Sequence, residues 1–417
     1  MKTILENGVG VVNIREDIAG VVESLRPEMV KFLVDLCSIP AVNPSFGGEG
    51  EYRRATWLAN FLEEHDLPVQ IMEVDDQSVP EGKRLNLVSR LRGSGEQGTL
   101  WIAAHMDTVA AGDMNTWETD PFSPVVRDGR IYGRGVEDNG QAIACMVYSL
   151  ITLKRLGLQP KKDLGLLFVS DEEAGSTYGL KFLAEEGLFK PEDEALVPDA
   201  GCADGSFIEV AEKSILWCRF TVVGKETHAS RPHCGINAGW VGSLFAVELI
   251  ETMRRKYRDR DDLFDPPFST FELTQKFANV SSPNVVPGKD VFTVDFRILP
   301  SWKLDTVVSD IDQLVTKYEY EHKVEINYDF PQRVDAPLPT SPEAAVVKNL
   351  SDSLKQRGLS PKIGGIGGGT CAAILREMGI PAVVWSTLDE LAHQPNEYAM
   401  IDNLVEDTKT FIVLALA

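Results

Sequence analysis

The side chains of this sequence that could do chemistry are acids and imidazoles that follow short apolar runs. The run LGLLFV, for example, is followed by one serine and then three acids. The candidates are, in chain order, His105, Asp107, Glu137, Asp138, Asp171, Glu172, Glu173, Asp199 and His393. Sites in open α/β sheets form at the carboxyl ends of strands. If the apolar runs are parallel strands, we expect these side chains to lie in one pocket.

A pocket so rich in acids needs positive charge. Carboxylates a few ångströms apart cannot all stay ionised without cations or raised pKa values. Imidazole nitrogens and carboxylate oxygens without thiolates suit zinc, cobalt or manganese, and are too rich in nitrogen for calcium. Each residue alone has an ordinary alternative: an incidental HxD, a solvated helix start at 171–173, an N-cap at Asp199 and a loop histidine at His393. Together, at successive strand ends, they favour a metal site.

Composition limits the class of protein. The 417 residues exceed one ordinary core, so two domains are expected. A net charge of −22 argues against a nucleic-acid partner and against docking on an anionic membrane. Six scattered cysteines without a CxxC pair are typical of a reduced, cytoplasmic protein. No apolar window reaches the length of a membrane span, and the first 17 residues lack the pattern of a signal peptide.

Apolar periodicity predicts the elements that position the candidates. Helices are expected over 14–40, 50–67, 141–158, 179–187, 341–359, 370–379 and from Asn403 onward. Strands are expected over 69–74, 85–91, 99–107, 164–173, 194–200 and 380–387. Strands that alternate with helices predict an α/β domain with a mixed, mostly parallel sheet flanked by helices.

The middle of the chain follows a different order. Strands are predicted over 214–224, 269–277, 291–299 and 323–330, and helices over 237–257 and 303–321. This βαββαβ order is that of a self-contained open sheet with two helices. We therefore predict a discontinuous larger domain, residues 1–212 and 332–417, with an inserted domain of residues 213–331.

Six motifs together resemble one family of dinuclear-metal amidohydrolases and peptidases. They are HMDTV, WETDPFSPVVRDGRIYGRGVEDN, VSDEEAGSTYGL, VPDAG, THASRPHCGINA and HQPNEY. The family includes succinyl-diaminopimelate desuccinylase, acetylornithine deacetylase, aminoacylase and carboxypeptidase G, and the resemblance extends from about Cys37 to the C-terminus. It implies a zinc-peptidase-like catalytic domain and an inserted domain that serves as lid and dimerisation domain.

The resemblance also implies two divalent metal ions per chain, with zinc as the first choice and cobalt or manganese as alternatives. His105, Asp138 and Asp199 would hold one ion. Asp138, Glu173 and His393 would hold the other, so that the Asp138 carboxylate bridges both ions.

Further roles follow from the same resemblance. Asp107 would orient the His105 imidazole, and Glu172 would be the general base. Since adjacent strand side chains point to opposite faces, SDEEAG should leave the strand in a turn that Gly175 assists; Asp171 is given only a backbone-capping role. The implied substrate-binding residues are His228, Asn284, Arg297, Gly369 and Thr370. His228 would act across a homodimer interface and hydrogen-bond the oxyanion.

The predicted function is metal-dependent hydrolysis of the amide C–N bond of a small carboxylate-bearing substrate, such as an N-succinyl- or N-acetyl-amino acid. An aminohydrolase that releases ammonia from a carboxylated amine, and an exopeptidase or dipeptidase, are alternatives that use the same activated water. A non-catalytic metal-binding protein would be expected to lack Glu172 or a ligand, and the sequence retains all of them. Asn139 and Gln141 depart from the family's pattern beside the site and leave the substrate open.

Overall fold

A computed structural model describes residues 16–417, so the segment on which the signal-peptide prediction rests lies largely outside them. The chain forms two compact units. The first extends to Val210 and resumes over Thr340–Ile363 and Thr370–Ala417. The second comprises Ala211–Pro339 and Gly364–Gly369, whereas the sequence placed the inserted domain at 213–331.

The glycine segment explains part of that difference. The N–H of Gly365 donates to the carbonyl of Leu263 at 2.6 Å, and the carbonyl of Ile366 accepts the N–H of Lys213 at 3.1 Å. These backbone bonds tie Gly364–Gly369 to the second unit, although the sequence assigned this segment to the larger domain. Backbone hydrogen bonds of this kind carry no sequence pattern that could have predicted them.

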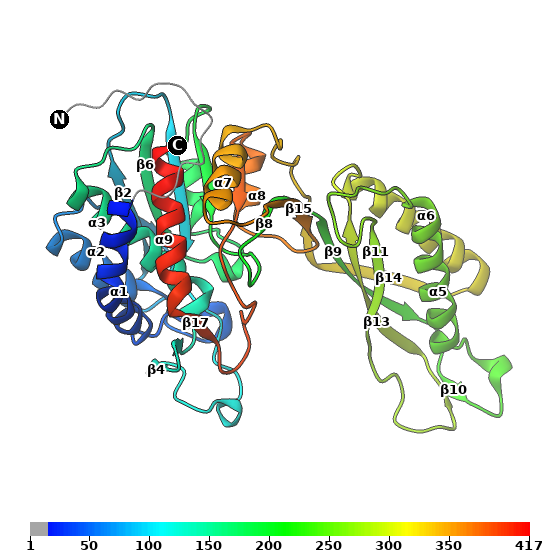
Figure 1. Cartoon of the computed structure of the whole chain (residues 1–417). Helices are drawn as coiled ribbons and strands as arrows, with labels where there is room; N and C mark the ends of the chain where they lie inside the picture. Colours follow the sequence, from blue (N-terminus) through cyan, green and yellow to red (C-terminus); the bar gives the residue numbers. More distant parts are fainter. Residues whose placement is uncertain (1–15) are drawn as a thin grey trace. The chain divides into compact units, whose positions relative to one another are not determined.

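An eight-stranded mixed sheet forms the centre of the first unit (Figure 1), although residues 211–212 and 364–366, at the ends of two of its strands, belong to the second unit. Its strands, in spatial order, are β1 (Gln70–Asp75), β2 (Lys83–Leu91), β6 (Asp163–Val169), β3 (Thr99–His105), β7 (Glu194–Val197), β16 (Ala382–Val384), β8 (Phe207–Glu212) and β15 (Lys362–Ile366). The central strands β6, β3, β7 and β16 are parallel, whereas β1, β2 and β8 pair antiparallel with their neighbours. The predicted fold class is confirmed, and the carboxyl ends of the central strands share one edge.

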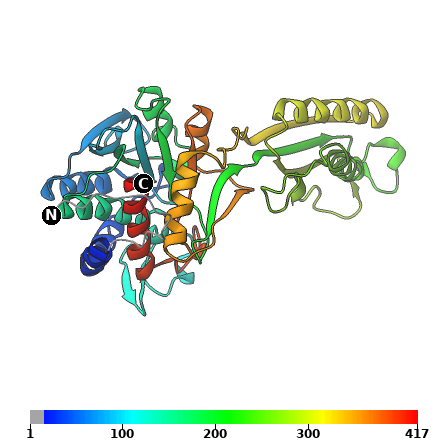
Figure 2. The ribbon, with the colours of Figure 1, turned by 45° about the horizontal axis from the view of Figure 1, so that its top comes forward.

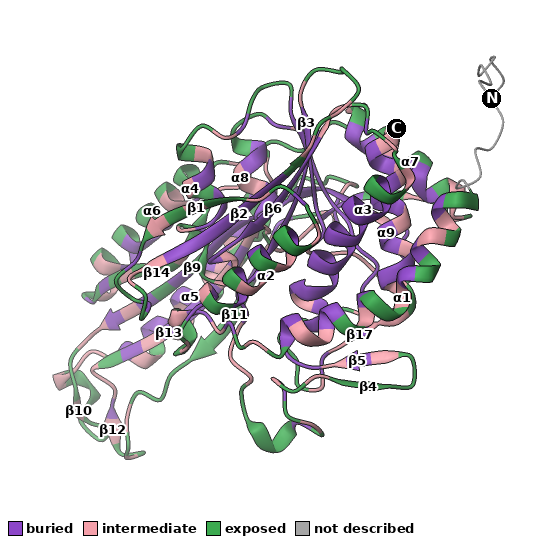
Figure 3. Ribbon diagram, turned by 90° about the vertical axis from the view of Figure 1, so that its left-hand side faces the viewer, coloured by how far each residue is buried: buried purple, intermediate pink, exposed green. Residues whose placement is uncertain are grey.

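Helices cover both faces of this sheet. They are α1 (Glu16–Cys37), α2 (Tyr52–Glu64), α3 (Ala142–Leu156), α4 (Leu180–Glu185), α7 (Ala345–Gln356), α8 (Ala372–Glu377) and α9 (Ile401–Leu416). Leu183 of α4 and Leu375 of α8 share a core with Trp101 of β3. Helices α1, α3 and α9 lie on the other side (Figure 3), and α7 lies beside α9 (Figure 2). Because both faces are covered, all seven residues of β3 are buried.

Three short strands complete the first unit. They are β4 (Val125–Arg127), β5 (Arg130–Tyr132) and β17 (Tyr398–Met400), in the order β17-β5-β4. These strands were not predicted because three residues are too few to show an alternating pattern. They join the segment before Asp138 to the segment after His393.

The second unit is built on a four-stranded antiparallel sheet. Its strands are, in spatial order, β11 (Thr270–Lys276), β13 (Lys289–Ile298), β9 (Ser214–Val223) and β14 (Glu325–Val334). Helices α5 (Ala238–Lys256) and α6 (Leu304–His322) share one apolar core with these strands, in which Phe220, Phe245 and Phe292 meet. The element order is the predicted βαββαβ. Two further short strands, β10 (Thr227–His228) and β12 (Val285–Val286), pair antiparallel and form a separate two-stranded ribbon.

Across residues 16–417, none of the helices combines the length and the apolar character that crossing a bilayer requires.

Candidate metal centre

Neighbouring parallel strands deliver the candidate ligands to one edge of the sheet. His105 is the last residue of β3, and it pairs in register with Val169, the last residue of β6. Glu173 follows β6 after a short turn, and Asp199 lies two residues beyond the end of β7. The chain leaves each strand at the same edge, so these side chains converge as the sequence predicted.

Each of the five predicted ligands lies within 3.4 Å of at least one other. Nε2 of His105 is 2.8 Å from Oδ1 of Asp138 and 3.3 Å from Oδ1 of Asp199. Nε2 of His393 is 3.4 Å from Oδ2 of Asp138 and 3.0 Å from Oε2 of Glu173. The two oxygens of Asp138 therefore face two different imidazoles, which is the arrangement of a carboxylate that bridges two cations.

The chemistry of this donor set fits divalent metal ions. Ligand atoms of His105, Glu172 and Asp199 all lie within 4.8 Å of one another, and so do those of His105, Asp138 and Glu173. Four acids and two imidazoles without a thiolate match the nitrogen and oxygen preference of zinc. The excess of acid over base also needs the positive charge that two divalent ions would bring.

Charge coupling between the ligands shows in their pKa values. Burial disfavours the imidazolium of His105, but hydrogen bonds to Asp138 and Asp199 outweigh burial and raise the pKa of His105 well above its usual value. Asp138 and Glu173 accept hydrogen bonds from His393 and raise the pKa of that imidazole to about 10. In turn the two imidazoles hold the pKa of Asp138 below its usual range despite its burial. The imidazoles here take the place that cations would fill.

Glu172 is a carboxyl group with a raised pKa beside the predicted ligands. Burial raises the pKa of its carboxyl group well above the ordinary value, and the nearby Asp199 carboxylate adds to the rise. A carboxyl group with a raised pKa can both take up and return a proton near neutral pH.

The turn that carries Glu172 and Glu173 forms as the sequence predicted. Asp171 has a left-handed φ of 62° and Gly175 a φ of 104°, and a single 3-10 turn, Glu172–Ala174, lies between them. The carboxylate of Asp107 accepts the backbone N–H of Glu172 at 3.0 Å and that of Glu173 at 3.3 Å. The two adjacent acids are therefore presented by a turn and not by a strand.

Asp107 contacts His105 through its backbone carbonyl. Nδ1 of His105 lies 2.9 Å from the backbone carbonyl oxygen of Asp107, but 3.7 Å from its carboxylate. The carbonyl oxygen therefore accepts the ring N–H, which leaves Nε2 for the metal side. The carboxylate of Asp107 is engaged with the Glu172 turn.

Asp171 belongs to a buried polar network that the sequence analysis missed. Its carboxylate accepts the N–H of Tyr178 at 3.2 Å, which is the predicted backbone cap. It also accepts Nη1 of Arg84 and Nδ2 of Asn43, each at 3.1 Å. The same amide of Asn43 donates to Asp107 at 2.8 Å, so this network connects Asp171 to the residue that holds the Glu172 turn.

Glu397 is a further residue that sequence reasoning missed. Its buried carboxylate accepts the backbone N–H groups of Gly135, Glu137 and Asp138 at 2.9 to 3.1 Å. It is also paired with Nη1 of Arg134 at 2.6 Å. Its place in the HQPNEY motif was the one signal that could have pointed to it. Glu397 fixes the backbone from which Asp138 projects.

His228 and Asn284, both in the second unit, are brought together by the β10–β12 ribbon. His228 pairs with Val285, and the N–H of Ala229 donates to the carbonyl of Asn284 at 2.8 Å. Nδ1 of His228 accepts the backbone N–H of Ser230 at 3.1 Å. In the neutral ring the proton therefore resides on Nε2. Their predicted roles toward substrate stay predictions.

Arg297 is already engaged within the second unit. Its Nε and Nη2 donate to the two carboxylate oxygens of Asp295 at 2.8 and 3.1 Å, and Nη1 donates to the carbonyl of Gly367 at 2.8 Å. The prediction that this guanidinium binds a substrate carboxylate requires Asp295 to release it. A Cβ at Gly369 would lie in ordinary van der Waals contact with Glu212 and Ile215, and Oγ1 of Thr370 accepts the N–H of Ala372 at 3.2 Å.

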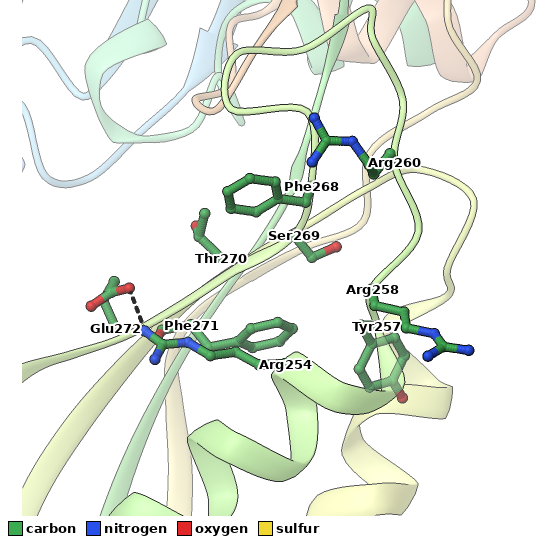
Figure 4. Close-up of a pocket in the computed structure, with 9 residues that line it drawn as sticks. All are labelled: Arg254, Tyr257, Arg258, Arg260, Phe268, Ser269, Thr270, Phe271 and Glu272. Carbon is green, nitrogen blue, oxygen red and sulfur yellow. Dashed lines mark hydrogen bonds and ion pairs between the residues drawn. The ribbon is translucent and has the colours of Figure 1, made fainter.

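A cavity of about 370 Å³ also lies in the second unit, and it contains none of the predicted site residues (Figure 4). Three arginines line it, but their guanidinium groups do not converge. Arg254 is turned to Glu272 at 2.9 Å, whereas Arg258 and Arg260 point in different directions. This arrangement lacks the convergent cations that an anion site requires.

This chain is similar to members of one protein family in sequence and in fold. The model of peptidase family M20/M25/M40 matches residues 101–417. An uncharacterised metallohydrolase of Methanocaldococcus jannaschii is 38% identical over 411 residues, which cover 93% of this chain and 98% of that protein. Succinyl-diaminopimelate desuccinylase of Nitratiruptor sp. is 27% identical over 376 residues, with 89% and 94% covered. In fold, aminopeptidase PepT from Bacillus cereus matches with a TM-score of 0.75 at 19% identity, covering 93% of this chain and 97% of that one.

Proposed function

This chain belongs to peptidase family M20/M25/M40, and from that membership we propose that it is a metallohydrolase that cleaves the amide C–N bond of a small N-acylated, carboxylate-bearing substrate. The observation that carries the proposal is Asp138, whose two carboxylate oxygens face His105 and His393, with the acids Glu172 and Glu173 beside it. Similarity to a succinyl-diaminopimelate desuccinylase supports N-succinyl- or N-acetyl-amino acids as the substrate class.

Two divalent ions are the proposed cofactor, with zinc first and cobalt or manganese as alternatives. His105, Asp138 and Asp199 would hold one ion, and Asp138, Glu173 and His393 the other. Such ions, when bound, would lower the pKa of a bound water and polarise the carbonyl of the substrate.

The chain's own residues would handle the protons. Glu172, with its raised pKa, takes a proton from the attacking water and returns it to the leaving nitrogen. The backbone bond from Glu172 to Asp107 keeps this carboxyl group in place through both transfers. The carbonyl of Asp107 holds the tautomer of His105, and Asn43 and Arg84 hold the turn from behind.

A substrate panel with metal analysis tests this proposal. The metal-free chain, reloaded with zinc, cobalt or manganese, would be assayed on N-succinyl- and N-acetyl-amino acids, dipeptides and carboxylated amines, with acyl release and ammonia release scored separately. Turnover of acylated substrates with about two ions bound per chain supports the proposal. Ammonia release alone would assign the aminohydrolase alternative, and dipeptide cleavage alone the exopeptidase alternative. A chain that binds no divalent ion would contradict all three.

A homodimer through the second unit is also proposed. Trp240 and Val247, seven residues apart on one face of α5, are each 64% exposed. Leu273 of β11, the edge strand of its sheet, and Phe277, directly after that strand, are also exposed. Exposed apolar side chains on a helix and an unpaired edge are features of a surface that another chain covers. Light scattering would measure the mass, and Trp240→Glu with Val247→Glu should shift it to that of a monomer.

The dimer would bring His228 to the partner's centre, where it would hydrogen-bond the oxyanion. Complementation tests this role. A mixture of His228→Ala and Glu172→Gln chains, co-expressed so that mixed dimers form, should regain activity that neither variant has alone. If His228 acts within its own chain, the mixture stays inactive.

No nucleic-acid or membrane partner is proposed, in line with the net charge of −22. The cytoplasm is the proposed location, and the six cysteines, all of them free thiols, support a reducing compartment.

A further inference from the structure

The residues on either side of Asp138 contact the segments that carry two other ligands. Oε1 of Glu137 accepts the backbone N–H of Asp389 at 2.7 Å, and Oε2 accepts that of Leu391 at 2.6 Å. These two amides lie in the loop that leads to His393. The Glu137 side chain is 95% buried in this loop, since only 5% of the residue is exposed. The two backbone amides thus occupy both oxygens of one buried carboxyl group.

Asn139 performs the same task on the opposite side. Its Nδ2 donates to the carbonyl of Pro198 at 3.1 Å and to Oδ1 of Asp199 at 2.5 Å. The residue is 2% exposed. Asn139 therefore grips both the backbone before Asp199 and the carboxylate of Asp199 itself. It stands at one of the positions where this sequence departs from the pattern of its family.

The backbone between the two side chains is itself fixed. Glu397 accepts the N–H groups of Glu137 and Asp138, and Glu397 lies four residues after His393. The His393 segment and the Asp138 segment thus each contribute an acid that binds amides of the other. Movement of either segment would break hydrogen bonds on both.

We propose that Glu137 and Asn139 are positioning residues that act on different ligands. Glu137 positions His393 and Asn139 positions Asp199. Each thereby controls the affinity of one of the two metal sites. The inference rests on the proposed two-metal centre. It assigns different consequences to two residues that flank the same ligand.

Zinc titration of the metal-free, full-length chain tests the division. Glu137→Gln turns an acceptor into an NH₂ group that faces backbone N–H donors, and Asn139→Leu removes the donor while keeping the same branched skeleton of side-chain heavy atoms. His393→Ala and Asp199→Ala supply reference titrations, because each deletes one ligand of one site. Calorimetry with a competing chelator resolves the two binding steps.

The expected result is a matched pair of patterns. Glu137→Gln should weaken the step that His393→Ala weakens, and Asn139→Leu the step that Asp199→Ala weakens, each by about tenfold to a hundredfold. The other step should stay within about twofold of the unmodified chain, below the tenfold loss expected when an orienting partner is removed. Equal weakening of both steps by either variant, or no weakening, would overturn the proposal.

Asp193→Asn is the matched control. Asp193 is also a buried carboxylate that accepts a backbone N–H, from Thr99 at 2.8 Å, but it lies at the amino end of β3, away from His105. This variant should lose stability and keep both zinc affinities; if it loses zinc as the test variants do, general loosening of the fold explains the result and the inference is overturned. An unmodified chain that binds no zinc would instead contradict the proposed function. If Glu137→Gln does not fold, Glu137→Asp should give the same selective loss.

Discussion

The carboxylate of Asp107 accepts the backbone N–H of Glu172 at 3.0 Å. Asp107 follows β3 and Glu172 follows β6, so a residue from one strand fixes the turn after its neighbour. The carbonyl oxygen of the same residue receives the ring N–H of His105. One residue thus sets both the orientation of a ligand and the place of the proposed base, without touching a metal or a substrate.

Asp107→Asn should therefore damage the centre while leaving all ligands present. The carboxylate receives Asn43, Glu172 and Glu173 as donors, and an amide would turn an NH₂ group toward one of them. A buried donor left without an acceptor costs about 1–3 kcal/mol, and that loss should appear in the unfolding free energy. Turnover should fall by about a hundredfold because the base is displaced. Urea unfolding and steady-state kinetics measure the two effects; unchanged turnover would contradict the positioning role.

Glu172→Gln should separate proton transfer from metal binding. Loss of a general base lowers turnover by about 10²- to 10⁴-fold. Zinc content should stay as in the unmodified chain if Glu172 is the base. Because the Glu172 carboxylate lies close enough to His105 and Asp199 to hold an ion with them, the alternative role of ligand is testable in the same sample. A drop in zinc content, measured by plasma emission, would identify Glu172 as a ligand.

Strand order explains which parts of the centre the sequence could predict. Parallel neighbours end at one edge, so acids just beyond β6 and β7 had to meet His105 at the end of β3. Asp138 and His393 were different, since neither directly follows a strand of this sheet. Both were candidates from the sequence because they are an acid and an imidazole near predicted strands, and their role as ligands, like that of the other three residues, was implied by the family resemblance.

The roles of residues that act through backbone amides could not be predicted. Glu397, Glu137 and Asn43 hold loops by accepting main-chain N–H groups, and a main-chain donor is the same whatever residue it belongs to. The engagement of Arg297 did have a readable signal. Asp295 lies two residues earlier on the same strand, hence on the same face, and it takes the guanidinium fork that was expected to bind substrate.

Glu51→Gln should change how stability depends on pH. Burial, and then the nearby Asp107 carboxylate, raise the pKa of Glu51 to about 8 in the folded chain, from 4.5 when exposed. Neither carboxylate oxygen has a hydrogen-bond partner in the described part of the chain, and Nη1 of Arg84 is 3.6 Å away. The folded state therefore holds this proton more tightly than the unfolded state. The stabilisation that this bound proton gives the folded state is complete below pH 4.5 and is lost as pH rises through 8.

The glutamine variant removes this titration. Its unfolding free energy relative to the unmodified chain should rise between pH 4.5 and 8, by an amount on the order of a few kcal/mol at ~1.4 kcal/mol per pKa unit. Urea unfolding of both metal-free chains at pH 5.5 and 8.5 measures the difference. Parallel stabilities at the two pH values would show that Glu51 does not carry a raised pKa.

The tautomer of His228 predicts which amino acid can take over its hydrogen-bond donation. The backbone N–H of Ser230 occupies Nδ1, so the donor available to a substrate oxyanion is Nε2–H. The side-chain amide of glutamine reaches about as far as Nε2, whereas that of asparagine reaches only as far as Nδ1. His228→Ala should lower turnover by about 10²- to 10³-fold, as expected for loss of one oxyanion donor. His228→Gln should recover part of that loss in turnover with little change in KM, and His228→Asn should behave like His228→Ala. Equal activity of the glutamine and asparagine variants would mean that Nε2–H does not face the reacting atoms.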